Sequence, residues 1–241
     1  MFRVAYLVLI QRTNIQKQIT NSTFLFIDRI FRGAIKNVSI LIQSINHKKV
    51  LEKYYETVIV EDNLLNEIVA KLSRKNISII DIGCGIAGYH KNWLRNNKER
   101  DIQLFLMDSS TFNLAALRYG HGEFNRYYNS LKLAKKLLLK SSGAKRESIQ
   151  LIEVKSSFLE KLPKNLDLII SFISWGFHYP LDTYWDLMLE RMTIGSSVMI
   201  IDVRKNSISS DFLFTQKNVT IEIINETPKF DRVLIRKVSE K

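Results

Sequence analysis

A glycine-rich turn follows a short apolar run at residues 77 to 90, and its residue types and spacing suit ligand chemistry. Gly83, Gly85 and Gly88 lack side chains at points where a backbone must turn sharply and a ligand must come close. Asp81 places a carboxylate two positions before the first glycine. This order is typical of a buried parallel strand whose carboxyl end meets a small-molecule ligand.

The charge of Asp81 distinguishes between two kinds of ligand. The three glycines also satisfy G-x-G-x-x-G, a pattern typical of dinucleotide sites. A pyrophosphate binds bare backbone N–H groups, however, and a carboxylate facing it would repel it. A ligand with a cationic amine, such as the ammonium of a methionine moiety, fits Asp81 better. The alternative is a tight strand-to-helix turn that binds no ligand.

A second strand-end carboxylate follows 20 residues after Gly88. Asp108 closes the apolar segment 102–107, where it can accept hydrogen bonds from both hydroxyls of an adenosine ribose. The same residue could cap the helix that follows, and the two roles are compatible.

Strand-like and helix-like segments alternate from residue 77 onward, which predicts a parallel sheet wrapped on both faces. The last two strands are too close in sequence for a crossover helix and should form an antiparallel hairpin. We therefore expect an α/β fold with a doubly wound, mostly parallel seven-stranded sheet. The predicted strands are 77–82, 102–107, 149–154, 167–172, 197–203, 219–224 and 232–238.

Helical periodicity precedes the sheet. A helix over 24–46 is expected to pack on the α/β domain or on a second copy of it, with a membrane-surface helix less favoured because its polar face is short. A second helix should start near Asp62 or Asn63, which could be its N-cap. We predict an N-terminal helical extension at 1–61 and one domain at 62–241.

The connection between the second and third strands, residues 109 to 148, is longer than one crossover helix. We predict two helices in it, Thr111 to Tyr119 and Ser130 to Lys140, bridged by residues 120–125.

The stretch Asp-Ile-Gly-Cys-Gly-Ile-Ala-Gly at 81–88 resembles the first motif of the class I S-adenosylmethionine-dependent methyltransferases. The resemblance covers about residues 62 to 238 and implies a Rossmann-like fold with S-adenosylmethionine as cofactor. Ser157 stands where the family has an acid for the adenine amino group, and its hydroxyl can still form that hydrogen bond. The cofactor-binding residues implied are Asp81, Gly83, Cys84, Gly85, Gly88, Asp108, Ser157, Phe158 and Ser171.

In this fold the loop after the fourth strand lies where cofactor and acceptor meet, and here it reads Phe-Ile-Ser-Trp-Gly-Phe-His-Tyr-Pro at 172–180. Trp175, Phe177 and Tyr179 are the predicted substrate-binding residues. The loop lacks the Asn/Asp-Pro-Pro-Tyr motif of members that methylate nucleobase amines. It loosely resembles bacterial methyltransferases that modify surface sugars, which favours O-methylation of a small molecule such as a carbohydrate.

A hydroxyl acceptor gains from a base that removes its proton as the new bond forms. His178 in this loop is the candidate base, with a role as loop anchor the alternative. The other histidines do not group with acids in the sequence into a metal site, and we predict no metal. The single cysteine and the absence of zinc-finger spacing favour a reducing compartment, and we expect a cytoplasmic protein.

The sequence carries 36 Lys and Arg against 24 Asp and Glu, a net charge of +12 that raises the question of a polyanionic partner. Lys132, Lys136 and Lys140 fall on one helical face, although no aromatic residue is interleaved with them. An RNA methyltransferase, or a non-catalytic cofactor-binding or interaction protein of the same fold, therefore remains an alternative. We predict no signal peptide and no transmembrane segment. The oligomeric state stays open.

Overall fold

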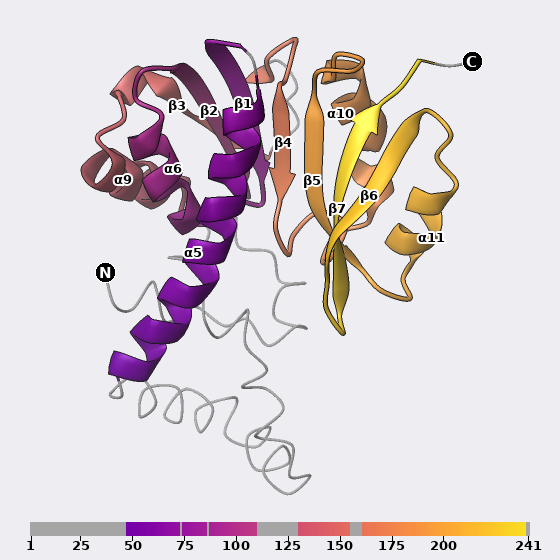
Figure 1. The fold of residues 1–241 in the computed structure, drawn as a ribbon, viewed down its shortest axis with the longest axis horizontal. Coiled ribbons are helices and arrows are strands. Elements are labelled where there is room, and N and C mark those ends of the chain that lie inside the picture. The colour runs from indigo at the N-terminus through magenta and orange to yellow at the C-terminus, as the bar shows by residue number, and fades with distance from the viewer. Residues whose placement is uncertain (1–46, 73, 86, 110–129, 155–160, 240–241) are drawn as a thin grey trace, which may run out of the picture.

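A computed structural model of the chain describes residues 47–72, 74–85, 87–109, 130–154 and 161–239. Its centre is one sheet of seven strands in the order β3-β2-β1-β4-β5-β7-β6 (Figure 1). The strand bounds are β1 Asn76–Ile82, β2 Asp101–Asp108, β3 Ile149–Glu153, β4 Leu168–Ser171, β5 Val198–Arg204, β6 Val219–Glu226 and β7 Phe230–Lys237. Each of the seven predicted strands is present.

The first five strands run parallel to one another, and β7 runs antiparallel to both β5 and β6. The order reverses direction at β1, because the chain moves outward to β2 and β3 and then returns to β4 on the other side. Such a switch point places a ligand crevice beyond the carboxyl ends of the central strands. The predicted fold class and the predicted terminal hairpin are confirmed.

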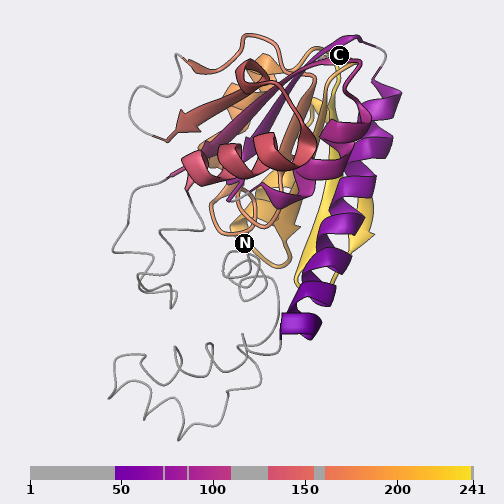
Figure 2. The same cartoon turned by 90° about the vertical axis from the view of Figure 1, so that its left-hand side faces the viewer.

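Helices cover both faces of the sheet (Figures 1 and 2). One hydrophobic cluster joins the sheet to α5 His47–Lys71, α6 Lys91–Asn96 and α9 Leu131–Ser142. The other joins the opposite face to α10 Trp185–Arg191 and α11 Ile208–Phe214. Three short 3-10 turns complete the described elements: η1 Gly88–His90, η2 Arg146–Ser148 and η4 Leu181–Thr183.

Strand β1 shows why the central strands are apolar throughout. Successive side chains of a strand point to opposite faces, and both faces here are covered by helices. Ile79 packs with the cluster of α5, α6 and α9, whereas Ile80 packs with the cluster of α10 and α11. Asp81 therefore lies on the same face as Ile79, the face that η1 and α6 cover.

The predicted helix at 130–140 is confirmed as α9. Its N-cap is Ser130, whose side chain accepts a hydrogen bond from the Leu133 N–H, and Gly143 ends it in the left-handed region at φ 71°. Both ends follow standard capping chemistry.

The predicted start of a helix at Asp62 or Asn63 is wrong, because α5 already begins at His47. Asp62 lies inside α5 and is buried, and its Oδ1 accepts the N–H of Trp93 at 2.8 Å. The carboxylate therefore satisfies a first-turn N–H of α6, which explains a capping residue in mid-helix. Helix α5 also runs across the proposed boundary between residues 61 and 62. The predicted helices at 24–46 and 111–119, with the bridge at 120–125, lie outside the described residues.

Candidate functional site

The glycine turn lies at the carboxyl edge of the sheet, where β1, β2 and β4 end together. Ile82 is level with Met107 in β2, and Asp81 is level with Ile170 in β4. Gly83 has φ 72° and Gly85 has φ 55°, and the N–H of Gly83 donates to the Met107 carbonyl at 2.7 Å. Both glycines thus occupy the left-handed region, where a side chain would strain the turn.

Gly83 is also a packing requirement. A Cβ atom at this position would lie 1.8 Å from Oγ of Ser174, in the loop after β4. The absence of a side chain at Gly83 therefore lets the glycine turn and the β4 loop meet closely. This contact supplements the predicted role of the glycine in ligand approach.

Asp108 ends β2 and accepts two backbone hydrogen bonds. Its Oδ2 accepts the N–H of Gly85 at 2.8 Å, and its Oδ1 accepts the N–H of Ser109 at 2.7 Å. Burial raises the pKa of Asp108 to about 7, against the opposing effect of these two donors. Each oxygen keeps a further lone pair that a ribose hydroxyl could approach.

Asp81 is fully buried, and one of its oxygens accepts two hydrogen bonds. The Tyr89 hydroxyl donates to Oδ2 at 2.7 Å, and Nε2 of His90 lies 2.7 Å from the same oxygen. The other oxygen, Oδ1, is buried and has no hydrogen-bond partner within the described residues. An unsatisfied buried carboxylate oxygen is unfavourable by about 1–3 kcal/mol or more unless a ligand supplies a donor.

Cys84 lies in the turn between these two acids. Burial raises the pKa of the Cys84 thiol, and the charges of Asp81 and Asp108 raise it further. The thiol is therefore neutral at ordinary pH, and Cys84 contributes a small buried side chain to the turn.

The loop after β4 is anchored by Ser171 and Trp175. The buried Ser171 hydroxyl donates to the Ile82 carbonyl at 2.9 Å and accepts the Trp175 N–H at 2.9 Å. The indole of Trp175 is 0% exposed and donates to the Leu181 carbonyl at 2.9 Å. Trp175 was predicted at the acceptor surface and Ser171 among the cofactor-binding residues. Because both side chains are buried, we propose that both anchor the loop.

A strained residue sets the direction of this loop. Ile173 has φ 54°, which is unfavourable for a β-branched side chain, and its N–H donates to Oδ2 of Asp202 at 3.1 Å. Arg232 in β7 pairs with both Asp202 oxygens, at 2.6 and 2.9 Å, and its guanidinium lies 4.0 Å from the Phe172 ring centroid. Glu61 of α5 contacts Arg232 at 3.3 Å. This buried ion-pair cluster holds the strained turn, and sequence reasoning did not find it.

The exposed end of the loop carries the remaining predicted residues. Tyr179 is 60% exposed and His178 is exposed, while Phe177 is half-buried with its ring edge-on to His178 and to Phe230. Burial raises the pKa of Tyr179, and the charge of Asp108 raises it further. Burial also raises the pKa of Tyr184, and the charges of Tyr179 and Asp108 raise it further. Tyr184 was not among the residues predicted from the sequence. Tyr179 and Tyr184 therefore lie within electrostatic reach of the strand-end carboxylate.

The structure thus gathers most of the predicted residues at one edge of the sheet. Gly88 is the first residue of η1 and begins the turn that carries Tyr89 and His90. Ser157 and Phe158 lie outside the described residues, so their predicted contact with adenine stays a prediction. Tyr89 and His90 were not identified from the sequence as neighbours of Asp81. The position of Trp93, three residues after His90 on the same helical face, could have indicated that Trp93 contacts His90.

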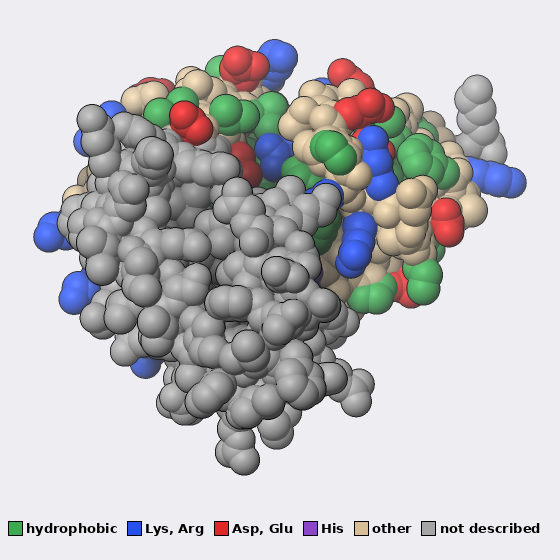
Figure 3. All heavy atoms as spheres, turned by 90° about the horizontal axis from the view of Figure 1, so that it is seen from below, with side chains coloured by type: hydrophobic (Ala, Val, Ile, Leu, Met, Phe, Trp, Pro, Cys, Tyr) green, Lys and Arg blue, Asp and Glu red, His purple; other side chains and the backbone are tan. Residues whose placement is uncertain are grey.

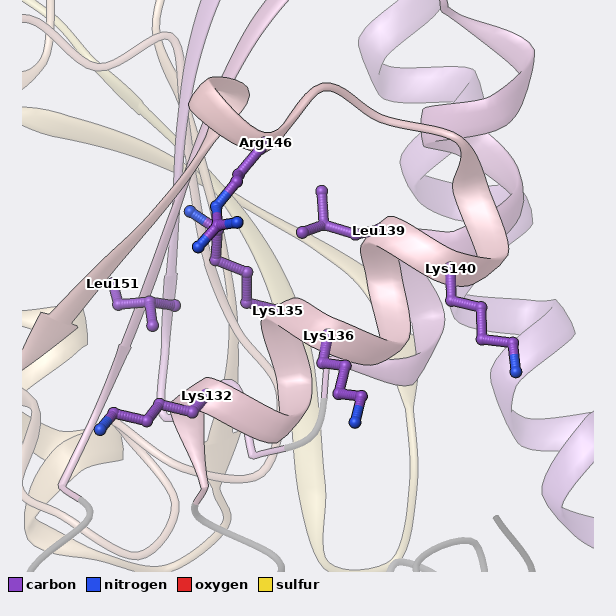
Figure 4. A pocket seen from close by; sticks show the side chains of 7 residues that line it. All are labelled: Lys132, Lys135, Lys136, Leu139, Lys140, Arg146 and Leu151. Carbon is purple, nitrogen blue, oxygen red and sulfur yellow. The ribbon is translucent and has the colours of Figure 1, made fainter.

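A basic hollow lies beside α9, and none of the residues that line it belongs to the glycine turn. Its volume is about 740 Å³, and Figure 4 shows its lysines along α9, with Arg146 in η2 and Leu151 in β3. Burial lowers the pKa of Lys135, and the nearby Arg146 lowers it further. The lining residues are Lys132, Lys135, Lys136, Leu139, Lys140, Arg146 and Leu151.

In Figure 3, which views the molecule of Figure 1 from below, the described atoms that are visible mix Lys and Arg with Asp, Glu and hydrophobic side chains. No helix in the described part of the chain is both long and apolar enough to cross a membrane. Among the same residues, no group of three or more His, Cys, Asp or Glu could hold a metal ion.

No protein-family model matches the sequence, and no curated protein matches it either. Solved structures do match. The StiE O-methyltransferase segment superposes with a TM-score of 0.55 at 12% identity, covering 83% of this chain and 81% of that one. A Klebsiella pneumoniae protein assigned as an O-methyltransferase gives 0.52 at 18%, covering 74% and 80%. A Staphylococcus aureus protein assigned as a caffeoyl-CoA O-methyltransferase gives 0.51 at 14%, covering 83% and 99%.

At these identities the likeness establishes the fold. The chain has the Rossmann-like fold of the S-adenosylmethionine-dependent methyltransferases, with the glycine turn and the strand-end acids at its switch point.

Proposed function

We propose that the protein is an S-adenosylmethionine-dependent methyltransferase that acts on a hydroxyl group of a small molecule. The observation that carries this proposal is the pair of strand-end carboxylates, Asp81 and Asp108, on either side of the glycine turn. Asp81 offers a buried oxygen without a partner, which suits a ligand ammonium. Asp108 offers acceptor lone pairs that suit a ribose diol. A methionine ammonium and an adenosine ribose both belong to this cofactor.

The geometry also fits the cofactor better than a dinucleotide. A pyrophosphate over the glycine turn would face two acids, Asp81 and Asp108, and the N–H of Gly85 already donates to Asp108. The backbone donors that a pyrophosphate needs are thus partly committed. We therefore retain the prediction that this site prefers a cationic ligand to a pyrophosphate.

The acceptor side of the proposal rests on the β4 loop. S-adenosylmethionine supplies an electrophilic methyl group on a sulfonium. When the methyl group is transferred, the sulfur keeps the bonding electrons and S-adenosylhomocysteine leaves as a neutral thioether. The protein has to hold the acceptor hydroxyl in line with that methyl and remove its proton. Tyr179 presents an exposed aromatic face near Asp108, and His178 presents an exposed imidazole next to it. We propose that Tyr179 contacts the acceptor, for example a sugar ring, and that His178 receives the proton.

Acceptor-dependent product formation tests the function. The purified protein would be incubated with S-adenosylmethionine and with panels of free sugars, nucleotide-linked sugars and phenols, and S-adenosylhomocysteine would be measured. We expect turnover with at least one hydroxyl acceptor, and loss of that turnover in Asp81→Ala. Formation of product only with RNA would replace the acceptor proposal, and binding of S-adenosylmethionine without turnover on any acceptor would support a non-catalytic protein.

A second candidate function, RNA methylation, is favoured by the basic hollow. Its lysines at 132, 136 and 140 recur once per helical turn, so they form a row of cations along α9. Five cations around one hollow would attract a phosphate backbone.

A salt titration of structured-RNA binding separates the two candidates. For the small-molecule enzyme, we expect weak affinity that collapses between about 50 and 200 mM salt. Tight binding at physiological salt would favour the RNA enzyme, provided that it is lost in Lys132→Gln/Lys136→Gln/Lys140→Gln. The matched control is Lys161→Gln/Lys164→Gln/Lys217→Gln, which removes three exposed charges that do not line the hollow.

A further inference from the structure

The two donors to Asp81 come from consecutive residues and meet the same oxygen. Tyr89 Oη and His90 Nε2 each lie 2.7 Å from Oδ2, and the three side chains are buried. Oδ1 of the same carboxylate is buried without a partner within the described residues. The carboxylate is therefore held from one side only.

The hydrogen bond from Trp93 determines which ring nitrogen of a neutral His90 carries the proton. Nε1 of Trp93 lies 3.0 Å from Nδ1 of His90, and an indole nitrogen can only donate. Nδ1 must then accept, so the proton of a neutral imidazole lies on Nε2 and points at Asp81. His90 is consequently a committed donor to the carboxylate, and it needs no positive charge for this role.

The support extends to α5. The backbone N–H of Trp93 donates to Oδ1 of Asp62 at 2.8 Å, and the Trp93 side chain is 0% exposed. The rings of Tyr89 and His90 lie 4.6 Å apart, and the Tyr89 ring lies 5.1 Å from Phe172 in the β4 loop. The rotamers of both donors are thus set by packing on several elements.

We propose that Tyr89 and His90 are positioning residues of the cofactor site, which hold Oδ2 of Asp81 so that Oδ1 is free to accept the cofactor's ammonium. This inference rests on the proposed function and adds two residues to it. It also explains why a buried carboxylate is tolerated in the core: two donors stabilise one oxygen, and the ligand completes the other.

The test compares a ligand that carries the ammonium with a ligand that lacks it. S-adenosylhomocysteine carries the amino-acid part, whereas 5′-methylthioadenosine has the adenosine and the sulfur without it. Tyr89→Phe keeps the ring and removes only the donor. We expect it to weaken S-adenosylhomocysteine binding about tenfold, as does His90→Phe, and to change 5′-methylthioadenosine binding less than twofold.

Two further variants separate positioning from general stability. His90→Gln offers an amide donor to Asp81 and an amide oxygen to Trp93, so it should recover most of the affinity that His90→Phe loses. Ser197→Ala removes another buried hydroxyl, which donates to the Leu166 carbonyl at 2.6 Å next to the start of β5, and both ligands should bind it as they bind the wild type.

Equal loss of affinity for both ligands in Tyr89→Phe would overturn the positioning role and leave the proposed function standing. Failure of the wild-type protein to bind S-adenosylhomocysteine would overturn the proposed function itself, and the inference with it. If His90→Phe does not fold, Tyr89→Phe and His90→Gln carry the comparison.

Discussion

His90 and Asp81 meet at 2.7 Å in a part of the molecule from which solvent is excluded, although they are nine positions apart in the sequence. The glycine turn makes this possible. After the left-handed residues Gly83, Gly85 and Ala87, the chain enters η1 and returns Tyr89 and His90 to the end of β1. The turn therefore brings the Asp81 carboxylate and its two hydrogen-bond donors together.

Cofactor affinity should weaken as the pH falls through 7. Burial raises the pKa of Asp108 to about 7, so the ionised form that best accepts a ribose hydroxyl is depleted at pH 6. We expect about tenfold weaker binding of S-adenosylhomocysteine at pH 6 than at pH 8. Asp108→Asn should bind more weakly and show little change over this range. Calorimetric titration at the two pH values measures both, and equal affinity of the wild type at both would contradict the assignment.

The same pKa sets a trend in the stability of the free protein. The folded value of about 7 lies above the ordinary value of 3.8, so the stabilising contribution of the protonated Asp108 is lost as the pH rises through 7. Relative to Asp108→Asn, the wild type should lose up to about 1.4 kcal/mol of unfolding free energy per pH unit between pH 5 and 6.5. Denaturant unfolding at several pH values measures the difference. A difference that does not vary with pH would exclude the raised pKa.

Cys84 should react slowly with thiol reagents. It is the only cysteine in the sequence, it is buried, and burial and two neighbouring acids raise its thiol pKa. We expect the native protein to react with an aromatic disulfide at pH 8 at least about 100-fold more slowly than the denatured chain. A native rate close to that of the denatured chain would mean that the glycine turn is open to solvent.

His178→Ala tests the proposed base. A group that takes a proton in the transition state contributes little to ground-state binding, so kcat should fall about 10²-fold or more while S-adenosylhomocysteine affinity stays nearly the same. Parallel measurement of turnover and binding gives both numbers. Full activity would remove His178 from the mechanism, and joint loss of turnover and cofactor affinity would instead favour the anchoring role.

Trp175 and Tyr179 should behave oppositely because their burial differs. Trp175 is 0% exposed and Tyr179 is 60% exposed. Trp175→Ala should lower the unfolding free energy by about 3–5 kcal/mol. Tyr179→Ala should change it by about 0.5 kcal/mol or less but reduce kcat/KM for the acceptor about tenfold. Chemical denaturation and steady-state kinetics test the pair, and the reverse pattern would return Trp175 to the acceptor surface.

The sheet could be predicted from the sequence because its central strands are buried on both faces and therefore appear as apolar runs, such as 77–82 and 168–171. The tight turn after β1 could be predicted from its glycines, because few other residues adopt the left-handed backbone angles that Gly83 and Gly85 have. Local chemistry was sufficient for both predictions.

The supports of the site could not be predicted in this way, because they join residues that lie far apart in the chain. Asp62 satisfies the Trp93 N–H across 31 positions, and Arg232 pairs with Glu61 across 171. A single sequence gives no sign of such partners, and a carboxylate within a helix looks solvated. The burial of Trp175 was missed for a related reason: an aromatic residue in a loop suits a binding surface equally well until the packing is known.

Calorimetric titration of the wild type and of Asp81→Asn with S-adenosylmethionine, and of the wild type with NAD, tests the central claim most directly. The control is Asp167→Asn, which alters another buried carboxylate just before β4, where Asp167 accepts the Ser78 N–H and pairs with Arg74. We predict saturable binding of S-adenosylmethionine to the wild type and to Asp167→Asn, binding weaker by about 1.5–3 kcal/mol in Asp81→Asn, and no binding of NAD. Saturable NAD binding without any S-adenosylmethionine binding would contradict the account.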